Sequence, residues 1–196
     1  MRKCSLANLD ALLRTMAEAA SVYLPVDGSD GRAHFTKWED GVKMSEALNT
    51  VRSAKDFFFP QTENLMEFKT SGKNIEIIDS RTAKEDFVVF GVRACDIKAL
   101  EVLDKVFLSE PVDSFYAARR NHGIIVAMAC NEPEESCFCS VFGIDCAEPN
   151  GIADVAVWSK DNDLYWKSLT QKGEKLTEAV KELLTDADEK DIEPLK

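Results

Sequence analysis

Six cysteines are the side chains of this 196-residue chain whose type and spacing could do chemistry. Cys95 follows the apolar run DFVVFGVRA, and Cys130 follows HGIIVAMA. Cys137 and Cys139 lie a few residues further on, in CNEPEESCFC. Four thiolates that converge on one place can hold a [4Fe-4S] cluster or a tetrahedral zinc ion. The cysteine pattern therefore favours a metal-holding module.

The spacing of these cysteines differs from that of the common metal motifs and leaves other interpretations open. A bacterial ferredoxin takes three ligands from one C-x2-C-x2-C run, and zinc ribbons have paired CxxC motifs. The sequence has neither pattern. Because cysteine is among the most buried residue types, separately buried structural thiols are an alternative. A redox disulfide is another.

Two predicted strands bring Cys95 and Cys130 to the same edge of a sheet. The runs DFVVFGV and GIIVAMA are continuously apolar, which is typical of strands covered on both faces. A helix from residue 97 to 107 and a second over roughly 112–121 separate them, which predicts a βαβ unit with a right-handed crossover. Functional groups collect where such strands end, and the CFC pair is close enough to fold back onto them.

Charges near Cys95 are expected to tune its thiol. Asp96 is a good N-cap for a helix that starts at Ile97, and the positive end of the helix dipole should lower the pKa of Cys95. Arg93 would add positive potential beside four negatively charged thiolates.

The distribution of apolar residues along the whole chain predicts an α/β fold class. We expect a mixed, largely parallel sheet, flanking helices and a long cysteine-bearing loop over 130–150. Residues 1–185 are expected to form a single domain, and 186–196 a solvated acidic tail. The further expected elements are helices at 5–20, 44–54 and 171–185, strands at SVYLPV and NIEIID, and a hairpin formed by ADVAVWS and LYWKSL.

Composition narrows the classes of function. The formal net charge of -11 argues against nucleic acid as a partner, because phosphates require a basic patch. No apolar run approaches the ~20 residues of a membrane span. The cytoplasm is the expected location, and there clustered cysteines indicate metal or redox chemistry.

Four motifs together carry a family resemblance. They are FFFPQTE at 57–63, GVRACD at 91–96, FYAARRN at 115–121 and CNEPEESCFCSVFG at 130–143. In this order they resemble the N-terminal domain of the family formed by sulfhydrogenase β subunits and the iron–sulfur subunits of anaerobic sulfite reductases, which are 4Fe-4S dicluster-domain electron-transfer proteins. The resemblance covers roughly residues 50–180. It implies that Cys95, Cys130, Cys137 and Cys139 hold an iron–sulfur cluster of their own.

The sequence departs from the family pattern in three respects. The family usually has proline before the first cysteine, where this chain has Ala94. Its ferredoxin-like segment, with two C-x2-C-x2-C-x3-CP runs, is not in this sequence, which indicates an excised domain or a shortened member. Cys146, in GIDCAEP, is not expected in the family and is interpreted as a bystander thiol rather than a spare ligand; Cys4 is interpreted as incidental.

The resemblance implies an electron-transfer domain or subunit of a multi-subunit anaerobic oxidoreductase, with flavin-containing and catalytic subunits, or a ferredoxin, as partners. The sequence shows no self-sufficient catalytic centre, so its status as an enzyme is left open. The alternative is a structural or docking module with buried cysteines or a structural zinc. A thiol oxidoreductase using Cys137 and Cys139 is a third hypothesis. Arg119 and Arg120 are expected either to face the cluster or to lie at a solvated helix end.

Overall fold

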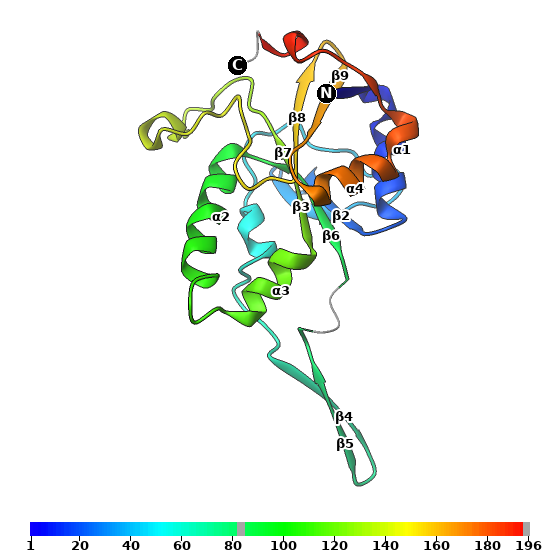
Figure 1. Cartoon of the computed structure of the whole chain (residues 1–196), viewed down its shortest axis with the longest axis vertical. Helices are drawn as coiled ribbons and strands as arrows, with labels where there is room; N and C mark the ends of the chain where they lie inside the picture. Colours follow the sequence, from blue (N-terminus) through cyan, green and yellow to red (C-terminus); the bar gives the residue numbers. More distant parts are fainter. Residues whose placement is uncertain (82–84, 194–196) are drawn as a thin grey trace.

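The computed structural model describes residues 1–81 and 85–193, in which an eight-stranded mixed sheet carries helices on both faces (Figure 1). The strand order is β10-β1-β9-β8-β7-β6-β2-β3. The pairs β2–β6, β6–β7 and β7–β8 at the centre are parallel, and antiparallel strands flank them on both sides. The strands are β1 (Arg2–Ser5), β2 (Ser21–Asp27), β3 (Ala33–Lys37), β6 (Phe87–Val92), β7 (Gly123–Met128), β8 (Val155–Lys160), β9 (Asp163–Ser168) and β10 (Thr185–Asp186). The predicted mixed α/β class is confirmed.

The βαβ unit that positions the cysteines is confirmed as well. From β6 the chain runs through helix α2 (Ala94–Phe107) and helix α3 (Ser114–His122) into β7, which pairs with β6 in parallel. Asp113 caps α3 by accepting hydrogen bonds from the amides of Phe115 and Tyr116. Both strands are almost wholly buried, as their apolar runs predicted.

Each face of the sheet has its own apolar core. Helices α1 (Leu9–Ala17) and α4 (Gln171–Ala179) cover one face, where Val88 and Phe90 of β6 point. Helices α2 and α3 cover the other, where Val89 packs (Figure 1). Alternate residues of β6 thus fill opposite cores, because successive strand side chains point to opposite faces.

The predicted hairpin of β8 and β9 is confirmed, and its two-residue turn has a clear local cause. Asp161 and Asn162 adopt positive φ angles of 52° and 65°. Both central residues of a type I′ turn require positive φ, which Asn and Asp tolerate better than most residues.

Three of the predicted helices need correction. The helix expected over 44–54 is wrong: the chain there is irregular, because the Ser45 amide bonds to the Pro25 carbonyl at 2.8 Å, and only a 3-10 turn (Ala54–Phe57) forms. The first helix is shorter than 5–20, since residues 2–5 form β1. The last ends at Ala179, followed by a 3-10 turn (Lys181–Leu183).

Strands β4 (Met66–Ser71) and β5 (Asn74–Asp79) form a separate two-stranded hairpin that projects from the body (Figure 1). NIEIID is therefore a strand, as predicted, but it lies in this hairpin. Register places Met66, Phe68, Ile75 and Ile77 on one face, each 60–70% exposed. We call residues 66–79 the arm.

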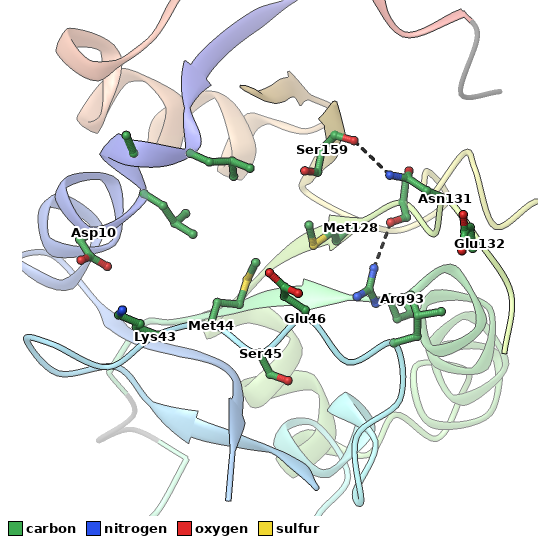
Figure 2. A pocket seen from close by; sticks show the side chains of 15 residues that line it. Asp10, Lys43, Met44, Ser45, Glu46, Arg93, Met128, Asn131, Glu132 and Ser159 are labelled. Carbon is green, nitrogen blue, oxygen red and sulfur yellow. Dashed lines mark hydrogen bonds between the residues drawn. The ribbon is translucent and has the colours of Figure 1, made fainter. Parts of the chain in front are cut away.

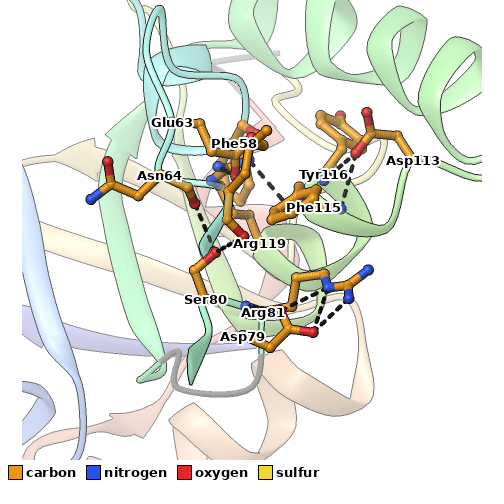
Figure 3. A network of polar contacts seen from close by, with 11 residues as sticks. Phe58, Glu63, Asn64, Asp79, Ser80, Arg81, Asp113, Phe115, Tyr116 and Arg119 are labelled. Carbon is orange, nitrogen blue, oxygen red and sulfur yellow. Dashed lines mark hydrogen bonds and ion pairs between the residues drawn. The ribbon is translucent and has the colours of Figure 1, made fainter. Parts of the chain in front are cut away.

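A polar network joins the base of the arm to α3 (Figure 3). The Ser80 hydroxyl donates to the Asn64 carbonyl at 2.7 Å, and Arg119 forms an ion pair with Glu63. Arg120 makes two bonds of 2.8 and 3.0 Å to the Asp104 carboxylate. Arg119 and Arg120 do not face the cysteines, because α3 ends where β7 begins, at the opposite edge of the sheet. They also do not lie free in solvent, because each forms an ion pair with a carboxylate. Both expectations for these arginines are therefore wrong.

The acidic segment after residue 185 is mostly exposed in its described part, but it is attached to the body. The Ala187 amide donates to the Met1 carbonyl at 3.2 Å, and Ile192 is fully buried beside Trp158 and Tyr165. The domain limit at residue 185 stays a prediction. In the described ranges, no helix has both the length and the apolar character that a membrane span requires.

Candidate functional site

Five cysteines line one cavity of about 440 Å³ beyond the ends of β6 and β7. Cys95 lies in the first turn of α2, and the others come from the loop that follows β7. The cavity includes all four predicted residues, Cys95, Cys130, Cys137 and Cys139, and also Cys146, which the sequence pattern alone does not place at the site. Cys4 is buried in β1 within the core under α1, and it is absent from the cavity lining. All six thiols are free.

Backbone hydrogen bonds give the cysteine loop its shape. The Cys130 amide donates to the Cys146 carbonyl at 2.9 Å, which closes the neck of the loop. Inside it, a 3-10 turn (Cys139–Phe142) ends at Gly143, whose φ of +63° favours glycine. The Trp158 indole N–H of β8 donates to the Ala147 carbonyl at 2.7 Å and fixes the neck to the sheet.

One backbone amide points directly at a cysteine sulfur. The Glu134 N–H donates to Cys137 Sγ at 3.3 Å, while the Cys137 amide donates back to the Glu134 carbonyl at 2.9 Å. Hydrogen bonds from amides to sulfur stabilise a thiolate and are one of the means by which proteins set the potential of an iron–sulfur cluster.

Arg93 supplies the positive charge that the sequence predicted. Its guanidinium donates to the Ala129 carbonyl at 3.0 Å, which holds it between the ends of β6 and β7. There it favours the thiolate of Cys130 and so opposes the rise of that pKa. The arginine is thus placed to offset negative charge on the cysteines.

Burial is the main cause of the pKa shifts of three thiols at this site, Cys95, Cys130 and Cys139. It raises the pKa of Cys95, and the negative charge of Asp96 adds to the rise. Burial likewise raises the pKa of Cys130 and Cys139. The backbone amides at the start of α2 do lower the pKa of Cys95, as predicted, but burial outweighs them, so the net direction is opposite to the one predicted.

Asp96 is not the N-cap of α2, contrary to the prediction. Helix α2 begins at Ala94, so Asp96 lies inside its first turn rather than before it. The Asp96 carboxylate instead accepts bonds from Lys55 at 2.8 Å and Ser53 at 2.6 Å. These contacts join the first turn of α2 to the 3-10 turn that precedes the arm.

The donor set fits an iron–sulfur cluster in its chemistry. Five thiols line one cavity, and a [4Fe-4S] cluster takes one thiolate on each of its four irons. Within the described ranges no three His, Cys, Asp or Glu side chains are grouped closely enough to hold one metal ion.

A second cavity, of about 690 Å³, also lies beyond the ends of β6 and β7, where Arg93 and Asn131 are among its lining residues (Figure 2). Asn131 bonds there to the Ser159 carbonyl at 3.1 Å. Its charged side chains are of both signs, and its lining is otherwise rich in Leu and Met. Both cavities have Leu48, Arg93 and Glu132 in their lining.

Comparison with known proteins agrees with the motifs of the sequence. The chain is 34% identical over 133 residues, or 67% of its length, to sulfhydrogenase 2 subunit beta of Pyrococcus furiosus. It spans 38% of that relative's length. No family model and no solved structure matches the chain. Over its matched residues, the chain belongs to the sulfhydrogenase β subunit family.

Proposed function

We propose that this chain is an electron-transfer part of a multi-subunit oxidoreductase and holds one [4Fe-4S] cluster on Cys95, Cys130, Cys137 and Cys139. The observation that carries the proposal is the cavity lined by these four thiols, which come from two separate parts of the chain. A bound cluster would supply one-electron transfer at this position. The chain itself would supply ligands, charge and placement, and catalysis would reside in other subunits.

Different residues would hold the cluster and stabilise its charge. Cys95 is held by a helix, while Cys137 and Cys139 are held by the loop, so ligation would tie α2 to the loop. The Glu134 amide and the Arg93 guanidinium both favour negative charge on sulfur. Each of these interactions would ease reduction of a cluster and raise its potential.

The position of the site suits exchange of electrons with another protein. Three apolar side chains of the cysteine loop, Phe138, Val141 and Phe142, are 65%, 74% and 72% exposed. The loop lies at the outer end of the sheet (Figure 1). A partner that covered it would approach the cysteines closely. We propose flavin-containing and catalytic subunits, or a ferredoxin, as such partners.

The exposed apolar face of the arm favours a second candidate function. In this alternative the chain positions other subunits, and the cysteines hold a structural zinc or no metal. An isolated two-stranded hairpin is only marginally stable in water, and here four large apolar side chains face solvent. A docking role would account for the arm without any redox chemistry.

Metal analysis distinguishes these functions. The chain is purified anaerobically, reconstituted with ferrous iron and sulfide, and assayed for iron, acid-labile sulfide and zinc per chain. The proposal expects about four irons and four sulfides and an EPR signal after reduction with dithionite. Stoichiometric zinc without sulfide, or no metal after reconstitution, would favour the docking module.

A further inference from the structure

We infer that Cys146 is a reserve ligand, able to hold the corner iron of the cluster when Cys130 does not. The inference rests on the proposed function, since it concerns the same site. It assigns a role to a thiol that the family resemblance does not explain.

The first argument is position. Cys130 and Cys146 stand side by side at the neck of the loop, because the amide of one bonds to the carbonyl of the other at 2.9 Å. Both thiols are free, partly buried and in the lining of one cavity. The neck is also fixed to the sheet through Trp158, so neither cysteine depends on a distant rearrangement to reach the site.

The second argument is that the chain leading to Cys146 runs along the site. The Ile144 amide donates to the Cys139 carbonyl at 2.9 Å, two residues before Cys146. Ile144, Asp145 and Cys146 all line the cavity of the cysteines. Cys146 therefore follows a segment that is held against the site.

The third argument is the number of ligands. A [4Fe-4S] cluster has four irons and takes one thiolate on each, so five thiols leave one unused. Within the loop the cysteines are spaced C-x6-C-x-C-x6-C, with Cys130 and Cys146 equally far from the central CFC pair. This spacing makes the two outer cysteines equivalent in reach along the chain.

The exchange needs no oxidant or reductant. When a cluster is bound, Cys146 would give up its thiol proton and become a thiolate ligand, and the Cys130 thiolate that it replaces would take up one proton. One iron–sulfur bond would form and one would break, with no change in the number of electrons.

The test compares single and double alanine variants, because alanine offers no side-chain ligand. Cys130→Ala, Cys146→Ala and the double variant are reconstituted anaerobically beside the unaltered chain, and iron and sulfide are measured per chain. We expect Cys130→Ala and Cys146→Ala each to keep about four irons and the double variant to lose at least a quarter of its iron. Cys130→Ala should also show a changed EPR line shape, since one ligand has moved. Cys4→Ala, in the core under α1, is the matched control.

The inference is overturned if Cys130→Ala loses as much iron as the double variant while the unaltered chain holds four irons. That outcome leaves the proposed function standing. It is also overturned if Cys146→Ala alone loses iron, because Cys146 would then be a permanent ligand. An unaltered chain without iron would overturn the proposed function and this inference together. Thermal unfolding of each variant before reconstitution separates loss of a ligand from loss of the fold.

Discussion

The amide of Cys130 donates a 2.9 Å hydrogen bond to the carbonyl of Cys146, and this bond closes a loop that carries four of the five clustered thiols. The fifth, Cys95, comes from the start of α2. The site is therefore assembled from one loop closed on itself and one helix end. A loop closed in this way presents its sulfurs before any metal arrives, which lowers the entropic cost of ligation.

Removing the central loop cysteines should abolish cluster incorporation. Cys137→Ala and Cys139→Ala each delete one of the four proposed ligands, so we expect the iron content to fall to a small fraction of that of the unaltered chain. Iron and sulfide assays after reconstitution measure this. Cys4→Ala should retain full iron, and equal iron in all three variants would refute the assignment.

Removing the charge of Arg93 should make a bound cluster harder to reduce. The guanidinium favours negative charge at Cys130, so Arg93→Met is expected to shift the potential to more negative values. Arg93→Lys should restore part of the shift. A redox titration followed by EPR reads the change, and Arg14→Met, at an exposed position of α1, is the control. Identical potentials in all variants would contradict the assigned role.

Three of the clustered thiols, Cys95, Cys130 and Cys139, should react slowly with alkylating reagents near neutral pH in the metal-free chain. Burial raises the pKa of Cys95, Cys130 and Cys139, so their thiolate fraction is smaller than that of a free cysteine. Their rates with iodoacetamide should rise about tenfold per pH unit below their pKa and continue to rise where a free cysteine has levelled off. Peptide mass spectrometry measures each site, and a plateau near pH 8 would be inconsistent with raised pKa values.

Cys4 should make the fold less stable in alkali. Burial raises the pKa of this thiol to about 11 in the folded chain, from 9.0. The unfolded thiol therefore ionises first, and stability present below about pH 9 is lost as the pH rises toward 11, by up to about 3 kcal/mol. Urea unfolding at pH 8 and pH 10.5 measures the loss. In Cys4→Ala the difference between the two pH values should shrink; an unchanged difference would assign the effect to other groups.

Deleting the arm should cost the body little stability. Replacing residues 66–79 by a short Gly-Ser turn removes mostly exposed side chains and the Asp79–Arg81 ion pair, while the Glu63–Arg119 pair stays. We expect the free energy of unfolding to change by less than about 1 kcal/mol. Circular dichroism during urea unfolding is the measurement. As a matched comparison, Phe58→Ala, in the buried core, should cost about 3–5 kcal/mol.

The sequence predicted those parts of the fold whose cause is local. Continuous apolar runs identify β6 and β7, and positive-φ turn residues identify the hairpin of β8 and β9. The helix expected over 44–54 fails because Ser45 bonds to Pro25, twenty residues away, and no periodicity can reveal that contact. The exposed arm was equally hidden, since β4 carries no buried face.

In the candidate site, too, the sequence predicts what has a local cause and misses what depends on contacts between distant residues. Strand ends predicted that Cys95 and Cys130 share an edge, and the structure places them in one cavity. Cys146 was set aside because it lies outside the family motif, although its spacing mirrors that of Cys130 about the CFC pair. Its place at the site depends on the bond across the loop neck, which joins residues sixteen positions apart.

The bond from the Trp158 indole to the Ala147 carbonyl gives the site an intrinsic fluorophore. Trp158 is 1% exposed, and its ring nitrogen contacts the residue that follows Cys146. Its emission should respond to opening of the loop neck, and an iron–sulfur cluster nearby would quench it by energy transfer. Loading and loss of the cluster could then be followed in real time, without a label, in a chain with only three tryptophans.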